Sequence, residues 1–299
     1  MKAVDIQGLS KSFGKVTALD GISFSVEKGE LFGLIGPDGA GKTTLFRLLA
    51  TLLTPDSGTA TVDGLDIVDN YLSIRSRVGY MPGRFSLYPD LTVEENLKFF
   101  ASLFGVSVDE SYDLVAPIYK QIEPFRTRRA GKLSGGMKQK LALSCALIHR
   151  PSVLFLDEPT TGVDAVSRSE FWDMLSGLKQ KGISILVSTP YMDEASRCDR
   201  IALCNEGHIL GIDTPEGIVS RFDAPLYAVR ATNMFELLSA ARGVKGVAEC
   251  YPFGSAHHVV AEDGFDIEEF KKELKGVDGF HIEAISPTIE DVFIKLMKR

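Results

Sequence analysis

The stretch Gly36-Pro37-Asp38-Gly39-Ala40-Gly41-Lys42-Thr43-Thr44 fits the pattern G-x-x-x-x-G-K-[ST] and lies between two apolar segments, 31–35 and 45–52. Glycines let the backbone curl so that successive N–H groups face one anion. In this pattern the lysine reaches the β- and γ-phosphates, and the Thr43 hydroxyl is placed to hold Mg²⁺. The alternative is a glycine-rich turn that caps a helix. The strand before the loop and the helix after it favour a nucleoside triphosphate site.

The composition is typical of a globular protein. Of 299 residues, 44% are hydrophobic and 24% are charged, as in ordinary globular domains. No apolar run reaches the roughly 18 residues that a membrane-spanning helix needs, and the first residues lack the apolar core of a secretory signal. The net charge of −7 disfavours nucleic-acid binding. We expect a cytoplasmic chain whose four cysteines are reduced and structural.

The chain divides into two predicted domains. Residues 1–222 alternate short apolar runs with helical periodicity, which indicates an α/β domain with a mixed, largely parallel central sheet. Its expected buried strands are Leu31–Ile35, Val153–Leu156 and Ile183–Ser188, while Val4–Val26 indicates antiparallel strands. Residues 226–299 follow the order strand, helix, strand, strand, helix, strand, which predicts a small α+β domain of ferredoxin-like type. A final helix, 289–297, is expected to begin after the N-cap Thr288.

Two acids follow a buried strand. The apolar segment 153–156 is followed directly by Asp157 and Glu158, which places both carboxylates at the sheet edge where α/β folds bind ligands. We expect Asp157 to hold magnesium and Glu158 to polarise the attacking water. The alternative, a strand that ends in two solvated acids, is weakened by the phosphate loop earlier in the chain.

A second glycine-rich helix start is formed by Leu133-Ser134-Gly135-Gly136-Met137-Lys138-Gln139-Lys140. A serine N-cap followed by bare glycine amides makes an anion site at a helix start. The alternative is an ordinary glycine-rich helix entry. One nucleotide has no evident use for two phosphate cradles, unless the second serves the nucleotide of a neighbouring chain.

These three motifs, in this order and spacing, resemble the ATP-binding cassette (ABC) ATPases, and the likeness covers the P-loop NTPase part of the chain, 1–222. The LSGG sequence between the two nucleotide motifs is specific to that family. The resemblance implies ATP and Mg²⁺ as ligands and a dimer of two cassettes. Residues Ser134, Gly135, Gly136 and Gln139 of each cassette would then close over the ATP held by the other.

The resemblance also assigns two single residues. Phe13 occupies the position of the aromatic residue that stacks on adenine, an interaction worth about 1–3 kcal/mol in nucleic-acid sites. The alternative for Phe13 is a core side chain on an edge strand. Asp164 matches the aspartate at the dimer seam between the two sites.

The segment 285–293 resembles the end of ATPase subunits from two-component exporters of drugs, antibiotics and polysaccharides, in which the membrane channel is a separate polypeptide. This resemblance implies a location on the inner face of the cell membrane beside a polytopic partner. The segment Phe85–Thr92, at the start of a helical subdomain of about residues 84–150, would be the docking surface. Alternatively, this segment packs the helical subdomain on its own core.

Two positions depart from the family pattern. Gly83 stands where family members carry a glutamine that touches the magnesium or the attacking water. Pro190 stands where they carry a histidine that donates to the γ-phosphate, and proline has neither a polar side chain nor an amide N–H. Loss of one such donor costs about a hundred- to a thousandfold in rate. We therefore expect a site that binds ATP well and cleaves it slowly.

Several functional alternatives remain open. The chain is either the degenerate half of an asymmetric pair of cassettes or a homodimer in which Glu158 supports adequate turnover, with Arg84 or water covering the gap. Outside transport, the alternatives are a cassette protein that acts on ribosomes or DNA and a regulatory subunit that never hydrolyses ATP. The first of these usually has paired cassettes or a long coiled coil, and the sequence has neither.

Overall fold

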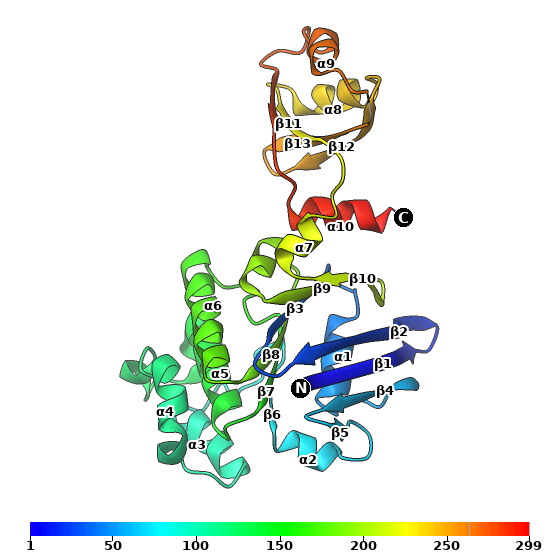
Figure 1. Ribbon diagram of the computed structural model, residues 1–299. Helices are drawn as coiled ribbons and strands as arrows, with labels where there is room; N and C mark the ends of the chain where they lie inside the picture. The colour runs from blue at the N-terminus through cyan, green and yellow to red at the C-terminus, as the bar shows by residue number, and fades with distance from the viewer. Residues whose placement is uncertain (263, 299) are drawn as a thin grey trace. The chain divides into compact units, whose positions relative to one another are not determined.

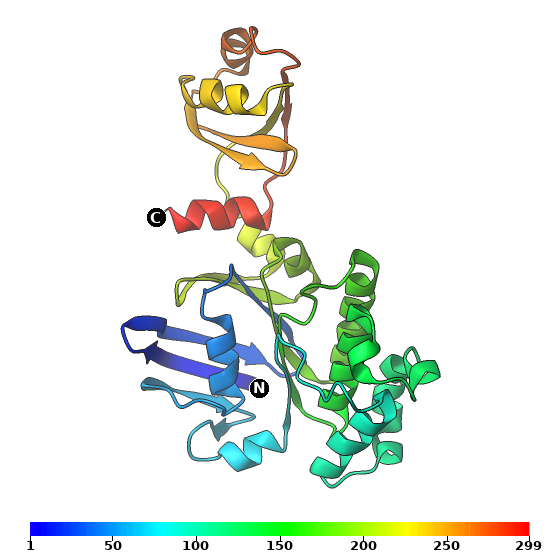
Figure 2. The same cartoon turned by 180° about the vertical axis from the view of Figure 1, so that it is seen from behind.

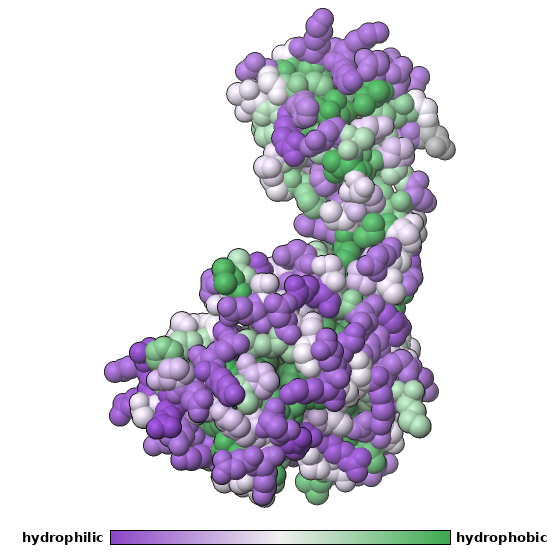
Figure 3. All heavy atoms as spheres, turned by 60° about the vertical axis from the view of Figure 1, so that its left-hand side comes forward, coloured by the Kyte–Doolittle hydropathy of each residue, from purple (hydrophilic) through white to green (hydrophobic). Residues whose placement is uncertain are grey.

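The computed structural model describes residues 1–262 and 264–298, which form two compact units, Met1–Pro215 and Glu216–Arg299. Among these residues, no helix is both long and apolar enough to cross a bilayer. On the face seen in Figure 3, hydrophilic residues predominate over the larger unit, and apolar residues form small separate patches.

The centre of the first unit is a six-stranded sheet with the order β10-β9-β3-β8-β7-β6. Its strands β9, β3, β8, β7 and β6 run parallel, and β10 is antiparallel to β9. The three strands in the middle are buried at every residue, as the apolar runs predict. The strands are β3 (Leu31–Ile35), β6 (Val78–Met81), β7 (Val153–Asp157), β8 (Ser184–Thr189), β9 (Arg200–Asn205) and β10 (His208–Asp213).

A second, antiparallel sheet covers the helix that follows the phosphate loop. Helix α1 (Lys42–Leu49) lies between this sheet and the central sheet, and α5 (Gly135–Leu147) and α6 (Ala165–Gln180) lie on the opposite side of the central sheet (Figures 1 and 2). One apolar cluster joins the two sheets through α1. In it, the ring centroids of the buried Phe46 of α1 and of Phe155 of β7 lie 6.2 Å apart. The second sheet has the order β2-β1-β4-β5, formed by β1 (Lys2–Phe13), β2 (Val16–Glu27), β4 (Ser57–Val62) and β5 (Leu65–Asp66).

Helices α3 and α4 both begin at capping boxes. The side chains of Thr92 and Ser107 accept a hydrogen bond from the backbone N–H three residues later. In return, the side chains of Glu95 and Glu110 accept one from the backbone N–H of Thr92 and Ser107. Helices α3 and α4 pack against α5, so that the predicted helical subdomain is a group of three helices. The remaining helical elements of this unit are α2 (Tyr71–Arg75), α3 (Val93–Leu103), α4 (Val108–Tyr119), α5 (Gly135–Leu147), α6 (Ala165–Gln180) and the short 3₁₀ turns η1 (Glu123–Phe125), η2 (Ala130–Lys132) and η3 (Met192–Arg197).

The second unit has the topology of a ferredoxin-like domain. Its antiparallel sheet has the order β12-β13-β11-β14, which in strand sequence is 2-3-1-4. Helices α8 and α9 pack on one face of this sheet around the fully buried Phe270. The elements are α7 (Pro215–Val219), β11 (Leu226–Arg230), α8 (Met234–Arg242), β12 (Val247–Phe253), β13 (Ala256–Ala261), α9 (Ile267–Glu273), β14 (His281–Ala284) and α10 (Ile289–Met297).

The last helix, α10, is attached to this sheet through one buried acid. Thr288 caps the helix with Asp291 at its third position, as the sequence predicts. Asp291 also accepts hydrogen bonds from Tyr251 (2.8 Å) and from the ring of His258 (2.6 Å). Burial alone raises the pKa of Asp291, but the hydrogen bonds from Thr288, His258 and Tyr251 outweigh it and lower the pKa below its usual value.

The boundary between the units differs from the predicted one. The sequence placed residues up to 222 in the cassette, whereas the structure groups 216–222 with the second unit. The physical reason is visible at Phe222, which is buried and whose ring lies 5.0 Å from the Lys295 ammonium of α10. All four cysteines are buried and unpaired, at Cys145, Cys198, Cys204 and Cys250.

Candidate functional site

The phosphate loop leaves β3 and enters α1 with a geometry that only glycine permits at two points. A Cβ on Gly36 would lie 2.2 Å from the carbonyl oxygen of Cys204, and one on Gly41 would lie 2.3 Å from that of Ala18. Gly41 also has φ of 96° and is the N-cap residue of α1. The backbone therefore approaches two neighbouring strands too closely for a side chain, and the start of α1 is free to face an anion.

The ammonium of Lys42 lies at the base of this loop. It donates to the carbonyl oxygens of Gly36 (2.8 Å) and Pro37 (2.9 Å), and it lies 3.1 Å from Oε1 of Glu158. The lysine side chain is almost fully buried. A buried ammonium is stable only when it is paired and hydrogen-bonded, so these contacts hold a cation at the base of the phosphate loop.

The two acids after β7 have different surroundings. The Asp157 side chain is buried, and Oδ1 accepts a 2.8 Å hydrogen bond from the hydroxyl of Ser188 on β8. Glu158 is half-buried and has φ of 49°, in the left-handed region. A residue other than glycine in that region costs of order 1–3 kcal/mol and is concentrated at functional sites. The strained turn directs Glu158 back toward Lys42.

These groups surround a cavity of about 440 Å³. One wall is formed by Val16, Thr17 and Ala18 at the start of β2, and Glu158 is on the cavity lining. The phosphate-loop residues of the lining are Asp38, Gly39, Gly41, Lys42, Thr43 and Thr44. The cavity thus combines a helix start, a buried lysine, three threonines and two acidic residues, which suits a polyanion whose terminal group reacts with water.

Comparisons with known proteins agree with this geometry. The model of the ABC transporter family matches residues 19–161. The Nod factor export ATP-binding protein I of Burkholderia lata is 36% identical over 307 residues, which cover 99% of this chain and 97% of that protein. The chain belongs to the ABC transporter family of ATP-binding proteins.

Two further matches extend the comparison of this ABC ATPase. The probable multidrug ABC transporter ATP-binding protein YbhF of Escherichia coli is 41% identical over 217 residues, which cover 72% of this chain but only 38% of YbhF. The solved structure of cbiO1 from Clostridium perfringens matches with a TM-score of 0.66 at 27% identity, over 73% of this chain and 91% of cbiO1. The likeness to a solved cassette confirms the predicted fold class.

The predicted signature motif starts helix α5. Ser134 is the N-cap and accepts from the backbone N–H of Met137 (3.4 Å), and both Ser134 and Gly135 are exposed. A Cβ on Gly136 would lie 2.7 Å from Oγ of Ser167 on α6. The glycines thus allow the start of α5 to contact the start of α6. This exposed helix start is available to a second molecule.

Asp164 and Gln139 belong to two different helices, α6 and α5. Asp164 is exposed at the N-cap of α6, where the Ser167 amide lowers the pKa of its carboxyl. Gln139 lies one turn into α5 and lines a separate cavity, next to Phe85 and Ser86. Ser134 and Gly135 are exposed, whereas Gln139, one turn along the same face of α5 as Gly135, is partly buried.

Phe13 lies beside the nucleotide cavity and not in its lining. Its side chain is 48% exposed, which excludes the core position that the sequence left open. Phe13 is paired with Val16 across the β1–β2 ladder, and Val16 does line the cavity. The Lys11 ammonium lies 5.8 Å from the Phe13 ring. The Phe13 ring is therefore an exposed side chain one ladder pair away from the cavity lining.

Gly83 adjoins the two acids. A Cβ on Gly83 would lie 3.1 Å from the carbonyl oxygen of Asp157 and 3.8 Å from Cβ of Glu158. A side chain here would begin beside both catalytic candidates, so the position that departs from the family pattern is part of the site. The glycine contributes no donor to it.

Pro190 directly follows β8 and lies next in the chain to Thr189, which belongs to a buried network that the sequence analysis missed. Thr189 and Thr160 both donate to Oε2 of the buried Glu194, at 2.6 Å and 3.1 Å. Arg168 of α6 lies 3.8 Å from the other oxygen of Glu194 and 4.9 Å from the ring of Tyr191. The network fixes the backbone on both sides of Pro190. Proline adds no hydrogen-bond donor there.

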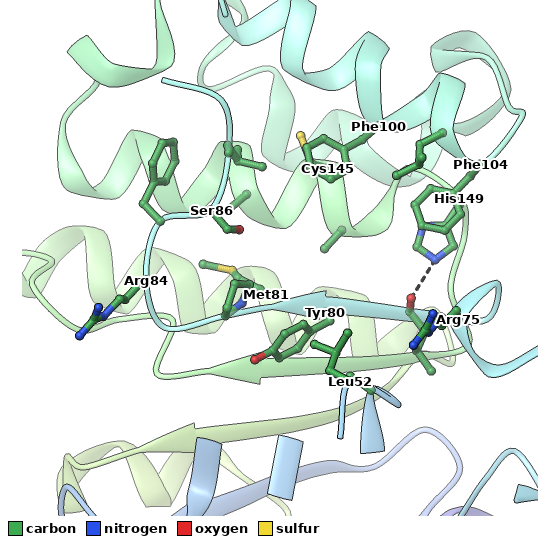
Figure 4. A pocket seen from close by; sticks show the side chains of 18 of the residues that line it. Leu52, Arg75, Tyr80, Met81, Arg84, Ser86, Phe100, Phe104, Cys145 and His149 are labelled. Atoms are coloured by element: carbon green, nitrogen blue, oxygen red, sulfur yellow. Dashed lines mark hydrogen bonds between the residues drawn. The ribbon is translucent and has the colours of Figure 1, made fainter. Parts of the chain in front are cut away.

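A larger cavity of about 600 Å³ lies between β6, α3 and α5 (Figure 4). The His149 ring stacks on Phe104 with centroids 3.8 Å apart and bonds the Val78 carbonyl through Nε2 at 3.0 Å, the dashed line in Figure 4. The predicted docking segment contributes Phe85, Ser86 and Leu87 to the lining, and further apolar residues include Leu52, Met81, Phe100 and Leu103.

Proposed function

We propose that this chain is the ATP-binding and ATP-hydrolysing subunit of an exporter, and that it works with a second cassette and a separate membrane-embedded subunit. The observation that carries the proposal is the nucleotide cavity, in which Lys42 and Glu158 lie 3.1 Å apart beneath the start of α1. Phosphoryl transfer requires mainly positioning and charge stabilisation. The helix start and the lysine provide both for a triphosphate.

The roles of the side chains follow from their positions. Lys42 would exchange its contact with Glu158 for the β- and γ-phosphates, which frees the carboxylate to accept a proton from the attacking water. Thr43 and Asp157 would hold Mg²⁺, since both offer the hard oxygen ligands that this ion prefers together with substrate phosphates. Bound there, the ion would neutralise charge on the phosphates. Phe13 would cover the adenine ring.

Hydrolysis at this site is expected to be slow. Gly83 and Pro190 supply no side-chain donor on either side of the acids, and each missing donor costs about a hundred- to a thousandfold in rate. The signature residues Ser134 and Gly135 remain exposed at an intact helix start. This difference supports an asymmetric pair, in which this chain completes a competent site on another cassette.

The apolar cavity of Figure 4 is the proposed binding site for a segment of the membrane subunit. Its lining includes Phe85, Ser86 and Leu87. These residues follow Gly83 by two to four positions, so an occupant of the cavity would touch the chain close to the acids of the nucleotide site. Phe85, which lines the cavity, is 38% exposed, and Tyr88 of the same segment is 48% exposed. Aromatic rings exposed beside an apolar hollow are typical of a protein-binding surface.

Steady-state phosphate release by the purified chain tests the proposal. We expect measurable MgATP binding, turnover below about 1 s⁻¹, the low end of ordinary enzymes, and loss of the remaining activity in Glu158→Gln. Lys42→Ala should abolish nucleotide binding by calorimetry, since the buried cation and its pairing with the phosphates are lost. Undiminished MgATP affinity in Lys42→Ala contradicts the assigned site. Turnover above that rate that vanishes in Glu158→Gln contradicts the slow site alone.

A non-hydrolysing regulatory subunit is the second candidate, and the missing donors at positions 83 and 190 favour it. The same measurements separate the two functions. A regulatory subunit binds MgATP with wild-type affinity and shows equal background phosphate release in the wild-type chain and in Glu158→Gln.

A further inference from the structure

We propose that Ser188 is a positioning residue that fixes both acids of the nucleotide site through one hydroxyl group. This inference rests on the proposed function, because it concerns the same site. Ser188 is fully buried near the end of β8, and it is the direct partner of Asp157 in the parallel ladder between β7 and β8. On its other side it pairs with Leu34, two residues before the phosphate loop.

The directions of the hydrogen bonds follow from chemistry. The Ser188 oxygen lies 3.0 Å from the backbone nitrogen of Glu158 and 2.8 Å from Oδ1 of Asp157. An amide N–H can only donate, so the hydroxyl oxygen accepts it. The single hydroxyl proton is then left for the carboxylate of Asp157, which accepts it in its ionised form.

The same contact holds the strained turn at Glu158. The Glu158 amide donates to the carbonyl oxygen of Ser188 (3.2 Å) as well as to its hydroxyl (3.0 Å). These two bonds anchor a residue with φ of 49°, a conformation that persists only where the surroundings determine it. The direction in which the Glu158 side chain leaves the strand therefore depends on Ser188.

The hydrogen bond from Ser188 holds Oδ1 of Asp157 and leaves Oδ2 without a hydrogen bond from the residues that the structure describes. Among the residues that the structure describes, Ser188 is the sole hydrogen-bond donor to the Asp157 carboxylate, and it engages Oδ1 alone. The carboxylate is thereby held in one rotation, with Oδ2 left for a cation. Because Gly83 and Pro190 bring no donor to the acids, their orientation depends on this hydroxyl more than it would with both donors present.

The test compares Ser188→Ala with Ser188→Thr and with Ser184→Ala in the full chain. Ser184 is a matched control, since it is buried on the same strand and its hydroxyl also accepts a backbone N–H, that of Gly29 at 3.0 Å. Three quantities are measured for each variant. They are kcat and KM for MgATP, the affinity for ATP in excess chelator, and the Kd for Mn²⁺ in the presence of a non-hydrolysable ATP analogue, by electron paramagnetic resonance.

We expect Ser188→Ala to lower kcat and to raise the Mn²⁺ Kd, each about tenfold or more, as for a lost hydrogen bond to a charged group. Metal-free ATP affinity should stay within about twofold of wild type, because the hydroxyl contacts the acids and not the phosphate loop. Ser188→Thr should restore both quantities, and Ser184→Ala should change neither. If Ser188→Ala does not fold, Ser188→Cys provides the same comparison, since a thiol is a weak donor.

Two outcomes overturn the inference. One is a Mn²⁺ Kd in Ser188→Ala that equals that of Ser184→Ala. The other is a loss of metal-free ATP affinity in Ser188→Ala as large as the loss of Mn²⁺ affinity, which indicates a general structural role. A wild-type chain that binds Mn²⁺ and the analogue but does not turn over contradicts hydrolysis in the proposed function, while the Mn²⁺ comparison still decides the role of Ser188.

Discussion

Replacing Gly83 with glutamine is expected to speed ATP hydrolysis, because it returns a side-chain donor to the acids after β7. The position is suitable for a side chain. Gly83 is not among the glycines with positive φ, so an L-residue can adopt its backbone conformation. A Cβ there would lie 3.8 Å from Cβ of Glu158, which is ordinary contact, and 3.1 Å from the carbonyl oxygen of Asp157, which is tight.

The size of the effect is the difference between two terms. One preorganised donor that acts on developing charge is worth about 2.7–4 kcal/mol of barrier. The tight contact with Asp157 costs about 1 kcal/mol, the low end for an added carbon in a packed site. The net gain of about 1.7–3 kcal/mol corresponds to a rate increase of about twentyfold to 150-fold.

The assay is steady-state phosphate release at saturating MgATP for the wild-type chain, Gly83→Gln and Gly83→Ala. The alanine variant introduces the same contact with Asp157 but no amide, so we expect it to match the wild type or to be slower. The reasoning is refuted if glutamine and alanine give equal rates while both variants bind MgATP normally.

Two further predictions concern stability. Gly36→Ala places a methyl group 2.2 Å from the Cys204 carbonyl oxygen and should lower the free energy of unfolding by about 1–3 kcal/mol. Urea unfolding measures this, with Gly177→Ala as the control because a Cβ at Gly177 meets nothing within 4 Å. Equal stabilities of the two variants contradict the prediction. Asp291→Asn should destabilise the second unit by about 1.5–3 kcal/mol at pH 7. Because the folded pKa of Asp291 is depressed, its contribution is present above the ordinary value of about 3.9 and is lost as the pH falls through the folded value. The measurement is the free energy of unfolding of wild type and Asp291→Asn between pH 3 and 6. Parallel pH dependence of the two proteins contradicts a stabilising role of the ionised Asp291 carboxylate.

Local sequence signals predicted the fold best where one segment carries its own boundary information. Strand β3 and helix α10 have the predicted bounds, because the first is an apolar run that stops at Gly36-Pro37 and the second begins at a capping box on Thr288. Strand β8 was predicted one residue too early at both ends. Its end at Thr189 is set by pairing with Ile35 across the sheet, which no local pattern contains.

The candidate site was predictable as a set of motifs and not as a set of contacts. The phosphate loop, Asp157 and Glu158 could be named from spacing alone. The role of Ser188 depends on the register between two strands that are far apart in the chain, and the left-handed turn at Glu158 depends on that register too. The position of Gln139 in the lining of the larger cavity, next to Phe85, depends on how segment 85–87 packs against α5, which no local pattern contains.

The four buried cysteines make the protein ready for site-specific labelling. Burial raises the pKa of the Cys250 thiol to about 11 and that of Cys204 to about 12, and it raises the values of Cys145 and Cys198 further. Thiolates are the reactive species toward maleimides, so the native sulfurs should remain unmodified near neutral pH. A single cysteine introduced on an exposed helix would then carry a fluorophore alone, with no need to remove the natural ones.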